Sequence, residues 1–272
     1  MNFDKIFLIS DADGTLLTDD KNILEIDKVA IGEFIGGGGI FTIATGRGVS
    51  LARVVAEELN LKVPAVIFNG AAVYDFREER FLWQCELPSV AQDYVKLLME
   101  KFPTLGVEIL RNDEVNVVRT NTLEEEHIAF GCKEPLRRGL DKIPTDNWIK
   151  ALTVDEPEVI DGVIEFCNQN KSYFSDVHLV RSAPVFYEML PKGVNKGAGF
   201  KKLLELIGIK DKYIVAAGDF MNDLEMLQMA DLGIAVANAE EIVKKEADLI
   251  VCDNNSGSMS EIVEYLKKAK TI

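Results

Sequence analysis

The sequence predicts an α/β fold in which a parallel-sheet core is interrupted by an inserted α+β domain. Three observations lead to this prediction. Short, wholly apolar runs alternate with helix-like stretches near both ends of the chain, the middle shows alternating apolar and polar residues instead, and 272 residues suffice for about two domains. Apolar runs are typical of strands covered on both faces, whereas alternation is typical of strands with one exposed face.

The first third of the chain follows the order strand, helix, strand, helix, strand. Its strands are β-branched apolar runs, its helices carry apolar residues at helical spacing, and glycines at 36–39 end the first helix. Asn69-Gly70 predicts a tight turn after the third strand. The expected strands are 6–9, 41–44 and 65–68, and the expected helices are 23–35 and 49–59.

The last third resumes this order, and the middle departs from it. Strands are expected at 213–217, 232–236 and 249–251, with helices at 196–207, 224–229 and 239–246 and from 259 onward. In the middle, the alternating segments 108–119 and 178–189 predict half-exposed antiparallel strands, with helices at 90–102, 123–130 and 159–168.

Composition narrows the function classes. The chain has 30 Lys and Arg against 45 Asp and Glu, a formal net charge of −15, so we expect no binding to nucleic acid or to membranes. The N-terminal apolar run is too short for a leader or a membrane span, which predicts a cytoplasmic protein. No signal indicates the oligomeric state. Reduced thiols are expected at Cys85, Cys132, Cys167 and Cys252, since no C-x-x-C pair occurs.

Polar residues follow the apolar strands, and in an open parallel sheet ligands bind beyond the carboxyl ends of the strands. Carboxylates that meet at such an edge repel one another unless a cation lies among them. Hard oxygen ligands with room for water and phosphate specify Mg²⁺, which is therefore the expected cofactor. The segments concerned are Asp11 to Thr15, Thr45 to Arg47, Asn69-Gly70 and Gly218 to Asp223.

Such an edge can support phosphoryl transfer. One carboxylate can attack a phosphoryl group to form an aspartyl phosphate if a cation reduces their repulsion. A second acid two residues along can protonate the leaving oxygen and later deprotonate the attacking water. A hydroxyl, a lysine and backbone N–H groups can hold the remaining phosphate oxygens. The expected partner is a small phosphorylated metabolite.

Four segments together resemble, in order, the motifs of the haloacid dehalogenase superfamily: DADGTLL at 11–17, ATGR at 44–47, PKGVNKG at 191–197 and GDFMND at 218–223. The long insert before Pro191 and the run Asn69-Gly70-Ala71 resemble its Cof-type phosphatases, which carry a large α/β cap. The resemblance implies a Rossmann-like catalytic core at 1–82 and 191–272 and an inserted cap at 83–190 that sets specificity.

The resemblance also implies roles for the matching residues. Asp11 is expected to be the nucleophile and Asp13 the general acid and base. Thr45 is expected to hydrogen-bond the phosphoryl group, and Lys196 to neutralise its charge. Expected Mg²⁺ ligands are Asp11, the main-chain carbonyl of Asp13, Asp219, and Asp223 either directly or as an anchor behind the first ligands. Substrate-binding roles are expected for Gly46, Arg47, Asn69 and Asn222.

One departure from the family pattern is that Ser256-Gly257-Ser258-Met259 replaces an acidic-glycine-valine run, which could alter the rim of the site. The function implied is a Mg²⁺-dependent phosphomonoester hydrolase that uses an aspartyl phosphate and acts on small phosphorylated metabolites, sugar phosphates first. Two alternatives stay open. A phosphosugar mutase would need a bisphosphate activator, and a non-catalytic phosphosugar sensor would bind without turnover.

Simpler interpretations accompany several of these residues. Lys196 could be an exposed lysine at a helix start, and Asp219 and Asp223 could serve only the N-terminus of a helix. Arg47 could pair with a nearby acid, and Asn69 could serve turn chemistry alone. In the predicted cap, His127 and His178 are expected to be ordinary cap residues, and Glu124 to Glu126 a solvated helix face. The basic residues are candidates for contact with the substrate, with a solvated face as the default: Arg111, Arg119, Lys150 and Arg181.

Overall fold

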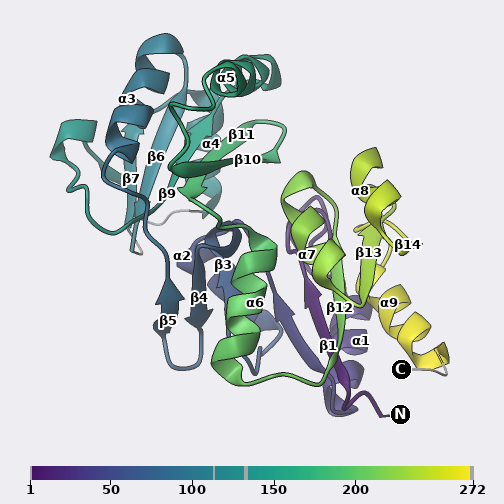
Figure 1. Ribbon diagram of the computed structural model, residues 1–272. Helices are drawn as coiled ribbons and strands as arrows, with labels where there is room; N and C mark the ends of the chain where they lie inside the picture. The colour runs from purple at the N-terminus through teal and green to yellow at the C-terminus, as the bar shows by residue number, and fades with distance from the viewer. Residues whose placement is uncertain (1, 113, 132–133, 270–272) are drawn as a thin grey trace. The chain divides into compact units, whose positions relative to one another are not determined.

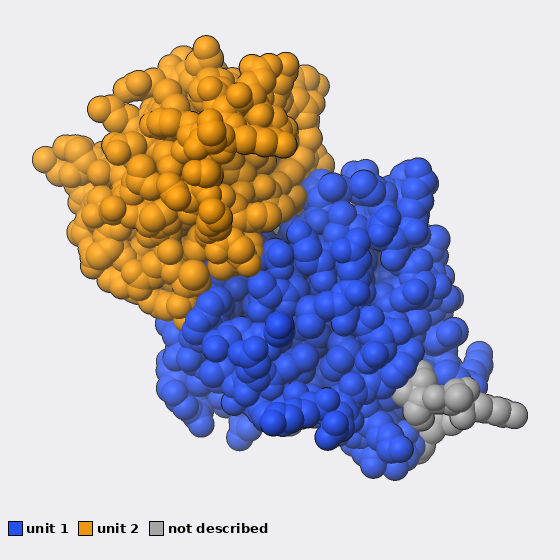
Figure 2. Space-filling model, viewed as in Figure 1, with its two compact units in different colours: residues 1–46, 52–83, 195–272 blue, residues 47–51, 84–194 orange. Residues whose placement is uncertain are grey.

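The computed structural model describes residues 2–112, 114–131 and 134–269 (Figure 1). The chain divides into two compact units (Figure 2). Unit 1 comprises residues 1–46, 52–83 and 195–272, and unit 2 comprises residues 47–51 and 84–194. Each unit has its own hydrophobic core. The assignment of 1–82 with 191–272 as catalytic core and of 83–190 as cap stays a prediction.

Unit 1 contains a parallel five-stranded sheet in the order β14-β13-β12-β1-β2. β1 and β13 are buried at every residue, as expected for strands with both faces covered. The strands are β1 (Ile6–Ser10), β2 (Ile40–Ile43), β12 (Tyr213–Gly218), β13 (Leu232–Val236) and β14 (Leu249–Val251). The predicted parallel-sheet core and α/β fold class are confirmed.

Helices pack in pairs beside this sheet: α1 (Glu25–Gly36) against α9 (Ser258–Lys268), and α6 (Lys196–Ile207) against α7 (Leu224–Met229). Two further α-helices of the described residues contribute to unit 1: α2 (Val49–Glu58), whose first residues belong to unit 2, and α8 (Glu241–Glu246). The first predicted helix begins two residues late, because Ile23 instead forms a bridge with Leu17.

A second, three-stranded sheet of β3 (Ala65–Ile67), β4 (Ala72–Asp75) and β5 (Arg80–Gln84) adjoins the first. A single parallel bridge between Ala44 and Val66 connects the two sheets. The tight turn expected at Asn69-Gly70 is the 3₁₀ turn η1 (Phe68–Gly70), from which β4 returns antiparallel to β3. β4 and β5 were not predicted, since no strand was expected between the turn at Asn69-Gly70 and the inserted domain.

Unit 2 is an α+β unit with a six-stranded sheet in the order β10-β11-β9-β6-β7-β8. Its strand pairs are antiparallel except for β7 with β8. Apolar side chains of α3 and α5 share one core with Val107, Ile109 and Ala151 of the sheet. The elements are α3 (Ala91–Lys101), β6 (Gly106–Arg111), β7 (Glu114–Arg119), α4 (Thr122–Gly131), β8 (Leu136–Arg137), η2 (Leu140–Lys142), β9 (Trp148–Val154), α5 (Pro157–Gln169), β10 (Val177–Ala183) and β11 (Phe186–Pro191).

The central strand β9 was not predicted, because its sequence WIKALTV is neither an unbroken apolar run nor a regular alternation of apolar and polar residues. Lys150 is nevertheless buried, and its Nζ lies 3.0 Å from the carboxylate of Glu188 on β11. The expectation that Lys150 is a surface group was therefore wrong. Three arginines of this unit have structural partners as well. Arg119 donates to the carbonyls of Met99, Phe102 and Leu105, while Arg111 and Arg181 pair with Asp146 and Asp161.

The acidic run on α4 was also expected to be solvated, and Glu124 contradicts that. Its side chain is fully buried, and burial together with neighbouring Glu108 raises the pKa of Glu124 to about 10. Glu124 is therefore a neutral acid at pH 7. The Nε2 atom of His127, one turn further along α4, lies 3.7 Å from the Glu108 carboxylate.

Cys85, Cys167 and Cys252 are free thiols, as predicted, and Cys132 lies outside the described residues. Across residues 2–112, 114–131 and 134–269, none of the helices combines the length and the apolar character needed to cross a bilayer.

Candidate active site

Three carboxylates from two distant parts of the sequence meet in unit 1. Each of Asp11, Asp219 and Asp223 offers an oxygen, and these oxygens lie within 4.8 Å of one another. The strand arrangement explains why they meet. β1 and β12 pair in parallel up to Ser10 and Ala217, and the backbone N–H of Asp11 donates to the carbonyl of Ala217 at 2.8 Å. The residues that follow these strands must therefore emerge side by side.

Lys196 connects two of the three carboxylates. Its Nζ lies 2.5 Å from Asp11 Oδ1 and 2.5 Å from Asp223 Oδ1, and the residue is only 2% exposed. A positive charge in the first turn of α6 opposes the helix dipole, so the carboxylates, not the helix, stabilise this lysine. Burial alone would lower the pKa of Lys196, but Asp11 and Asp223 raise it above its ordinary value. The interpretation of Lys196 as an exposed helix-start lysine was wrong.

Asp223 also organises the loop after β12. Its Oδ2 accepts hydrogen bonds from the backbone N–H groups of Asp219 and Phe220, at 3.0 and 3.1 Å. It therefore holds the turn, as the simpler interpretation expected, and belongs to the carboxylate cluster as well. With both oxygens engaged and no exposure, Asp223 is a fixed member of the site.

Asp219 is held by the loop that follows the neighbouring strand β1. Thr15 Oγ1 donates to Asp219 Oδ1 at 2.9 Å. Gly14 has a φ of +79°, and a Cβ there would lie 2.5 Å from Asp219 Oδ2, so only glycine allows this approach. The sequence did not predict this role for Thr15, although its place in the first motif was the available signal.

The cluster carries more negative than positive charge. Burial is the main reason that the pKa of Asp11 lies well above its ordinary value, although Lys196 lowers it in part. Burial and the neighbouring Asp223 raise the pKa of Asp219 to about 7. A cation would relieve this repulsion, and a set of carboxylate oxygens suits a hard divalent ion. The residues present therefore fit the expected metal chemistry.

Asp13 occupies a different environment. Its carboxylate lies 2.9 Å from Lys21 Nζ, and these side chains are 39% and 37% exposed. The Asp13 side chain is not part of the three-carboxylate cluster, and metal binding by its main-chain carbonyl stays a prediction. Sequence reasoning missed Lys21, since a lysine eight residues after a motif aspartate carries no recognisable spacing signal.

The predicted phosphate and substrate residues of unit 1 also lie together. The N–H of Asn69 donates to the carbonyl of buried Thr45 at 3.0 Å, and Asn222 Nδ2 donates to Asn69 Oδ1 at 2.9 Å. A Cβ at Gly46 would lie 3.0 Å from Asn69 Nδ2, so Gly46 lies directly against this amide. The ends of β2 and β3 and the loop after β12 are thus linked by hydrogen bonds.

Arg47 is assigned to unit 2, where its Nη1 donates to the carbonyl of Leu51 at 3.4 Å. Its predicted role in substrate binding stays a prediction.

Residues after β13 and after β14 support the loop that follows β1. Ser258 Oγ donates to the carbonyl of Thr15 at 2.7 Å, Asn254 Nδ2 to that of Leu17 at 2.9 Å, and Asn238 Nδ2 to that of Gly14 at 2.7 Å. Ser258 belongs to the run that departs from the family pattern. In this chain Ser258 therefore holds the segment that carries Asp13 in place through a hydrogen bond.

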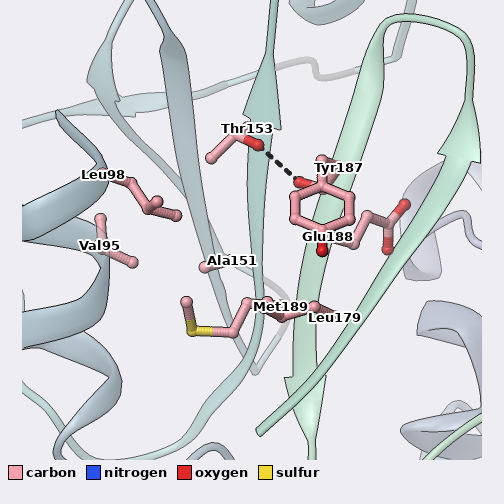
Figure 3. Close-up of a pocket in the computed structure, with 8 residues that line it drawn as sticks. All are labelled: Val95, Leu98, Ala151, Thr153, Leu179, Tyr187, Glu188 and Met189. Carbon is pink, nitrogen blue, oxygen red and sulfur yellow. Dashed lines mark hydrogen bonds between the residues drawn. The ribbon is translucent and has the colours of Figure 1, made fainter. Parts of the chain in front are cut away.

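A small pocket occurs elsewhere, within unit 2 (Figure 3). Apolar side chains of α3, β9 and β11 line most of it, and Thr153 Oγ1 donates to the carbonyl of Tyr187 at 2.7 Å at its edge. None of the predicted site residues lines this pocket, and it lacks the cations or carboxylate cluster that phosphoryl chemistry requires. The residues concerned are Val95, Leu98, Ala151, Thr153, Leu179, Tyr187, Glu188 and Met189.

Comparison with known proteins identifies the family. The sequence profile of haloacid dehalogenase-like hydrolases matches residues 8–263, nearly the whole chain. The chain belongs to this family. It is 30% identical to a 5-amino-6-(5-phospho-D-ribitylamino)uracil phosphatase of Bacillus subtilis, over 96% of this chain and 97% of the relative. A second B. subtilis phosphatase of the same name is 26% identical over 94% of this chain and 93% of its own length.

Solved structures agree with this assignment. A haloacid dehalogenase-like hydrolase from Bacteroides thetaiotaomicron is 25% identical, with a TM-score of 0.79 over 96% of this chain and 98% of the other. A subclass IIB sugar phosphatase of the superfamily is 21% identical, with a TM-score of 0.84 over 96% and 98%, which shows a shared fold. The predicted resemblance to Cof-type phosphatases is confirmed, and this haloacid dehalogenase-like hydrolase is a phosphatase.

Proposed function

We propose that this hydrolase is a Mg²⁺-dependent phosphomonoesterase that acts through an aspartyl phosphate on Asp11. The observation that carries the proposal is the buried contact of Lys196 with Asp11 and Asp223 inside the three-carboxylate cluster. Lys196 lowers the pKa of Asp11 against the larger effect of burial, and so favours the anionic form that a nucleophile requires. The same lysine offers positive charge to a phosphate.

In the first step, a carboxylate oxygen of Asp11 forms a bond to phosphorus while the bond from phosphorus to the leaving oxygen breaks. Asp13 gives its proton to that oxygen, and the alcohol departs. In the second step, Asp13 takes a proton from water as the water oxygen attacks phosphorus. The bond to Asp11 breaks, and inorganic phosphate and the free Asp11 carboxylate result.

The other residues hold the phosphoryl group. Asp11, Asp219 and the main-chain carbonyl of Asp13 would hold Mg²⁺, with Asp223 as a further ligand or as an anchor behind them. When bound, the ion would offset the charges of carboxylates and phosphate. Lys196 supplies a fixed positive charge, and the Thr45 hydroxyl and the Asn222 amide hydrogen-bond phosphate oxygens. Thr15 keeps Asp219 oriented through its 2.9 Å hydrogen bond.

We propose a sugar phosphate or polyol phosphate as the substrate class, with unit 2 acting as the cap that selects it. The names of two relatives support this class, since they specify a phosphorylated ribityl compound. A panel of phosphate esters should therefore include sugar phosphates, polyol phosphates with and without an attached pyrimidine, and p-nitrophenyl phosphate as a generic substrate.

The test measures inorganic phosphate release from this panel without any bisphosphate activator. Wild type should turn over, whereas Asp11→Asn should lose all activity, because the amide keeps the shape of the side chain and removes the nucleophile. Asp20→Asn removes an exposed carboxylate nine residues away and should behave as wild type. Normal hydrolysis by a folded Asp11→Asn variant would refute the mechanism, and a strict need for a bisphosphate would favour a mutase.

A further inference from the structure

Asn69 lies in a strained turn at the carboxyl end of β3. Phe68 and Asn69 have φ values of +53° and +54°, a left-handed conformation that residues other than glycine adopt at a cost. Both side chains are buried. Turns with consecutive left-handed residues favour Asn or Gly at these positions, and Phe68 is neither, so the surrounding contacts must hold it there.

Those contacts fix the backbone of the turn on two sides. The Asn69 N–H donates to the Thr45 carbonyl at 3.0 Å. Gly70 has a φ of +97°, and a Cβ there would lie 1.9 Å from the carbonyl oxygen of Asn195, directly before Lys196. The turn therefore packs against the start of α6, and Asn69 is held between two segments of the proposed site.

The side chain of Asn69 reaches a third segment. Its Oδ1 accepts a hydrogen bond of 2.9 Å from Nδ2 of Asn222, which lies 153 residues away and immediately precedes Asp223. Asn222 is 7% exposed, and among the described residues its buried Oδ1 has no hydrogen-bond partner. The contact to Asn69 is thus the side-chain hydrogen bond that fixes the plane of this carboxamide.

We propose that Asn69 is a positioning residue, which holds the carboxamide of Asn222 in the orientation that binds the phosphate group. This inference rests on the proposed function, in which Asn222 contacts phosphate, and it replaces the expected direct contact of Asn69 with substrate. The strained turn serves this purpose by placing one amide where it can orient another across the site. A carboxamide without that hydrogen bond rotates and loses an oriented donor for the anion.

A double-mutant cycle tests this role, with inorganic phosphate as the probe in the presence of Mg²⁺. Calorimetric titration gives its Kd for wild type, Asn69→Gly, Asn222→Ala and the double variant. Asn69→Gly relieves the backbone strain but removes the amide, and should weaken phosphate binding about two- to tenfold, the range of one hydrogen bond. The double variant should bind no more weakly than Asn222→Ala, because Asn69 acts through Asn222.

Two further variants keep the test independent of stability. Asn60 has a φ of +49° and is exposed, so Asn60→Gly relieves similar strain away from the site and should leave phosphate binding unchanged. Asn69→Asp keeps an acceptor for Asn222 and tolerates the left-handed conformation. When combined with Asn69→Asp, Asn222→Ala should weaken phosphate binding by the same factor as in wild type. When combined with Asn69→Gly, Asn222→Ala should have little further effect.

Multiplicative losses in the cycle, or an Asn69→Gly variant that alters only the melting temperature, would overturn the inference. Phosphate binding is measured without turnover, so this result is distinct from a failure of the proposed function, which Asp11→Asn decides. The same variants should show the loss in KM for the substrate, with a smaller change in kcat.

Discussion

Replacement of Lys196 by methionine offers a demanding test of the site's electrostatics. The substitution keeps most of the side-chain volume and removes the charge that lies 2.5 Å from both Asp11 and Asp223. Removing one partner of a buried ion pair costs about 3–5 kcal/mol, because the other charge stays buried without compensation. At about 2–4 °C per kcal/mol for a protein of this size, the melting temperature should fall by about 6–20 °C.

The control is Lys202→Met on the same helix. Lys202 lies 3.4 Å from Glu205 in a partly exposed pair, which is worth at most about 1 kcal/mol. Thermal unfolding of both variants, followed by circular dichroism at pH 8 with EDTA present, compares the buried and the exposed lysine directly. Equal melting temperatures for the two variants would refute the idea that Lys196 compensates the carboxylates.

The pH dependence provides a second criterion for this variant. The pKa of Asp219 is raised to about 7, from an ordinary value of 3.8. In the metal-free protein, the protonated Asp219 therefore contributes to the stability of the fold. This contribution is fully present below about pH 3.8 and is lost as the pH rises through 7. Because protonated carboxyls no longer repel one another, the melting-temperature deficit of Lys196→Met should be smaller at pH 5 than at pH 8.

Three further outcomes are expected. Saturating Mg²⁺ should raise the melting temperature of wild type more at pH 8 than at pH 5, because at pH 5 the ion must displace a proton from the carboxylates. An equal rise at both pH values would show that the ion binds outside the three-carboxylate cluster. Thr15→Val should raise the Mg²⁺ concentration for half-maximal activity about 10–100-fold through the loss of its hydrogen bond to Asp219, and an unchanged metal requirement would contradict that role. Glu124→Gln should keep or raise the melting temperature at pH 8, because Glu124 is already neutral there and its contribution to stability falls as the pH rises from 4.5 to about 10. The exposed Glu126→Gln is the control. A marked loss of stability confined to Glu124→Gln would show that the charge of Glu124 is needed.

The positions of Asp11 and Asp219 could be predicted because they depend on strand order alone. A buried apolar run predicts each strand, and parallel pairing brings the residues that follow the strands to one edge of the sheet. The partners of these residues could not be predicted in the same way. Whether a lysine in the first turn of a helix is exposed or buried depends on what packs against that turn, and Lys196 is buried because two carboxylates reach it.

Errors in unit 2 have a related cause. Three successive glutamates on α4 indicate a solvated face only if they all face outward, but in a helix every fourth residue returns to the same side. Glu124 shares a side with Ile128, and both are buried, whereas Glu125 and Glu126 are exposed. In β9, Lys150 interrupts an apolar run, and only pairing of that strand with β11 supplies the carboxylate of Glu188. The charge of a side chain therefore says little about its burial when its ion-pair partner is remote in sequence.

The contrast between Asp11 and Asp13 links the structure to the proposed chemistry. The two carboxylates are two residues apart, yet the first is buried against Lys196 and the second is partly exposed beside Lys21. A nucleophile must stay anionic and protected from water, whereas a residue that exchanges a proton with a leaving group and with water must reach both. The bridge between Asp13 and Leu17 and the contacts of Ser258 and Asn254 hold the loop that separates these environments. One short segment after β1 can therefore supply two chemically different carboxylates.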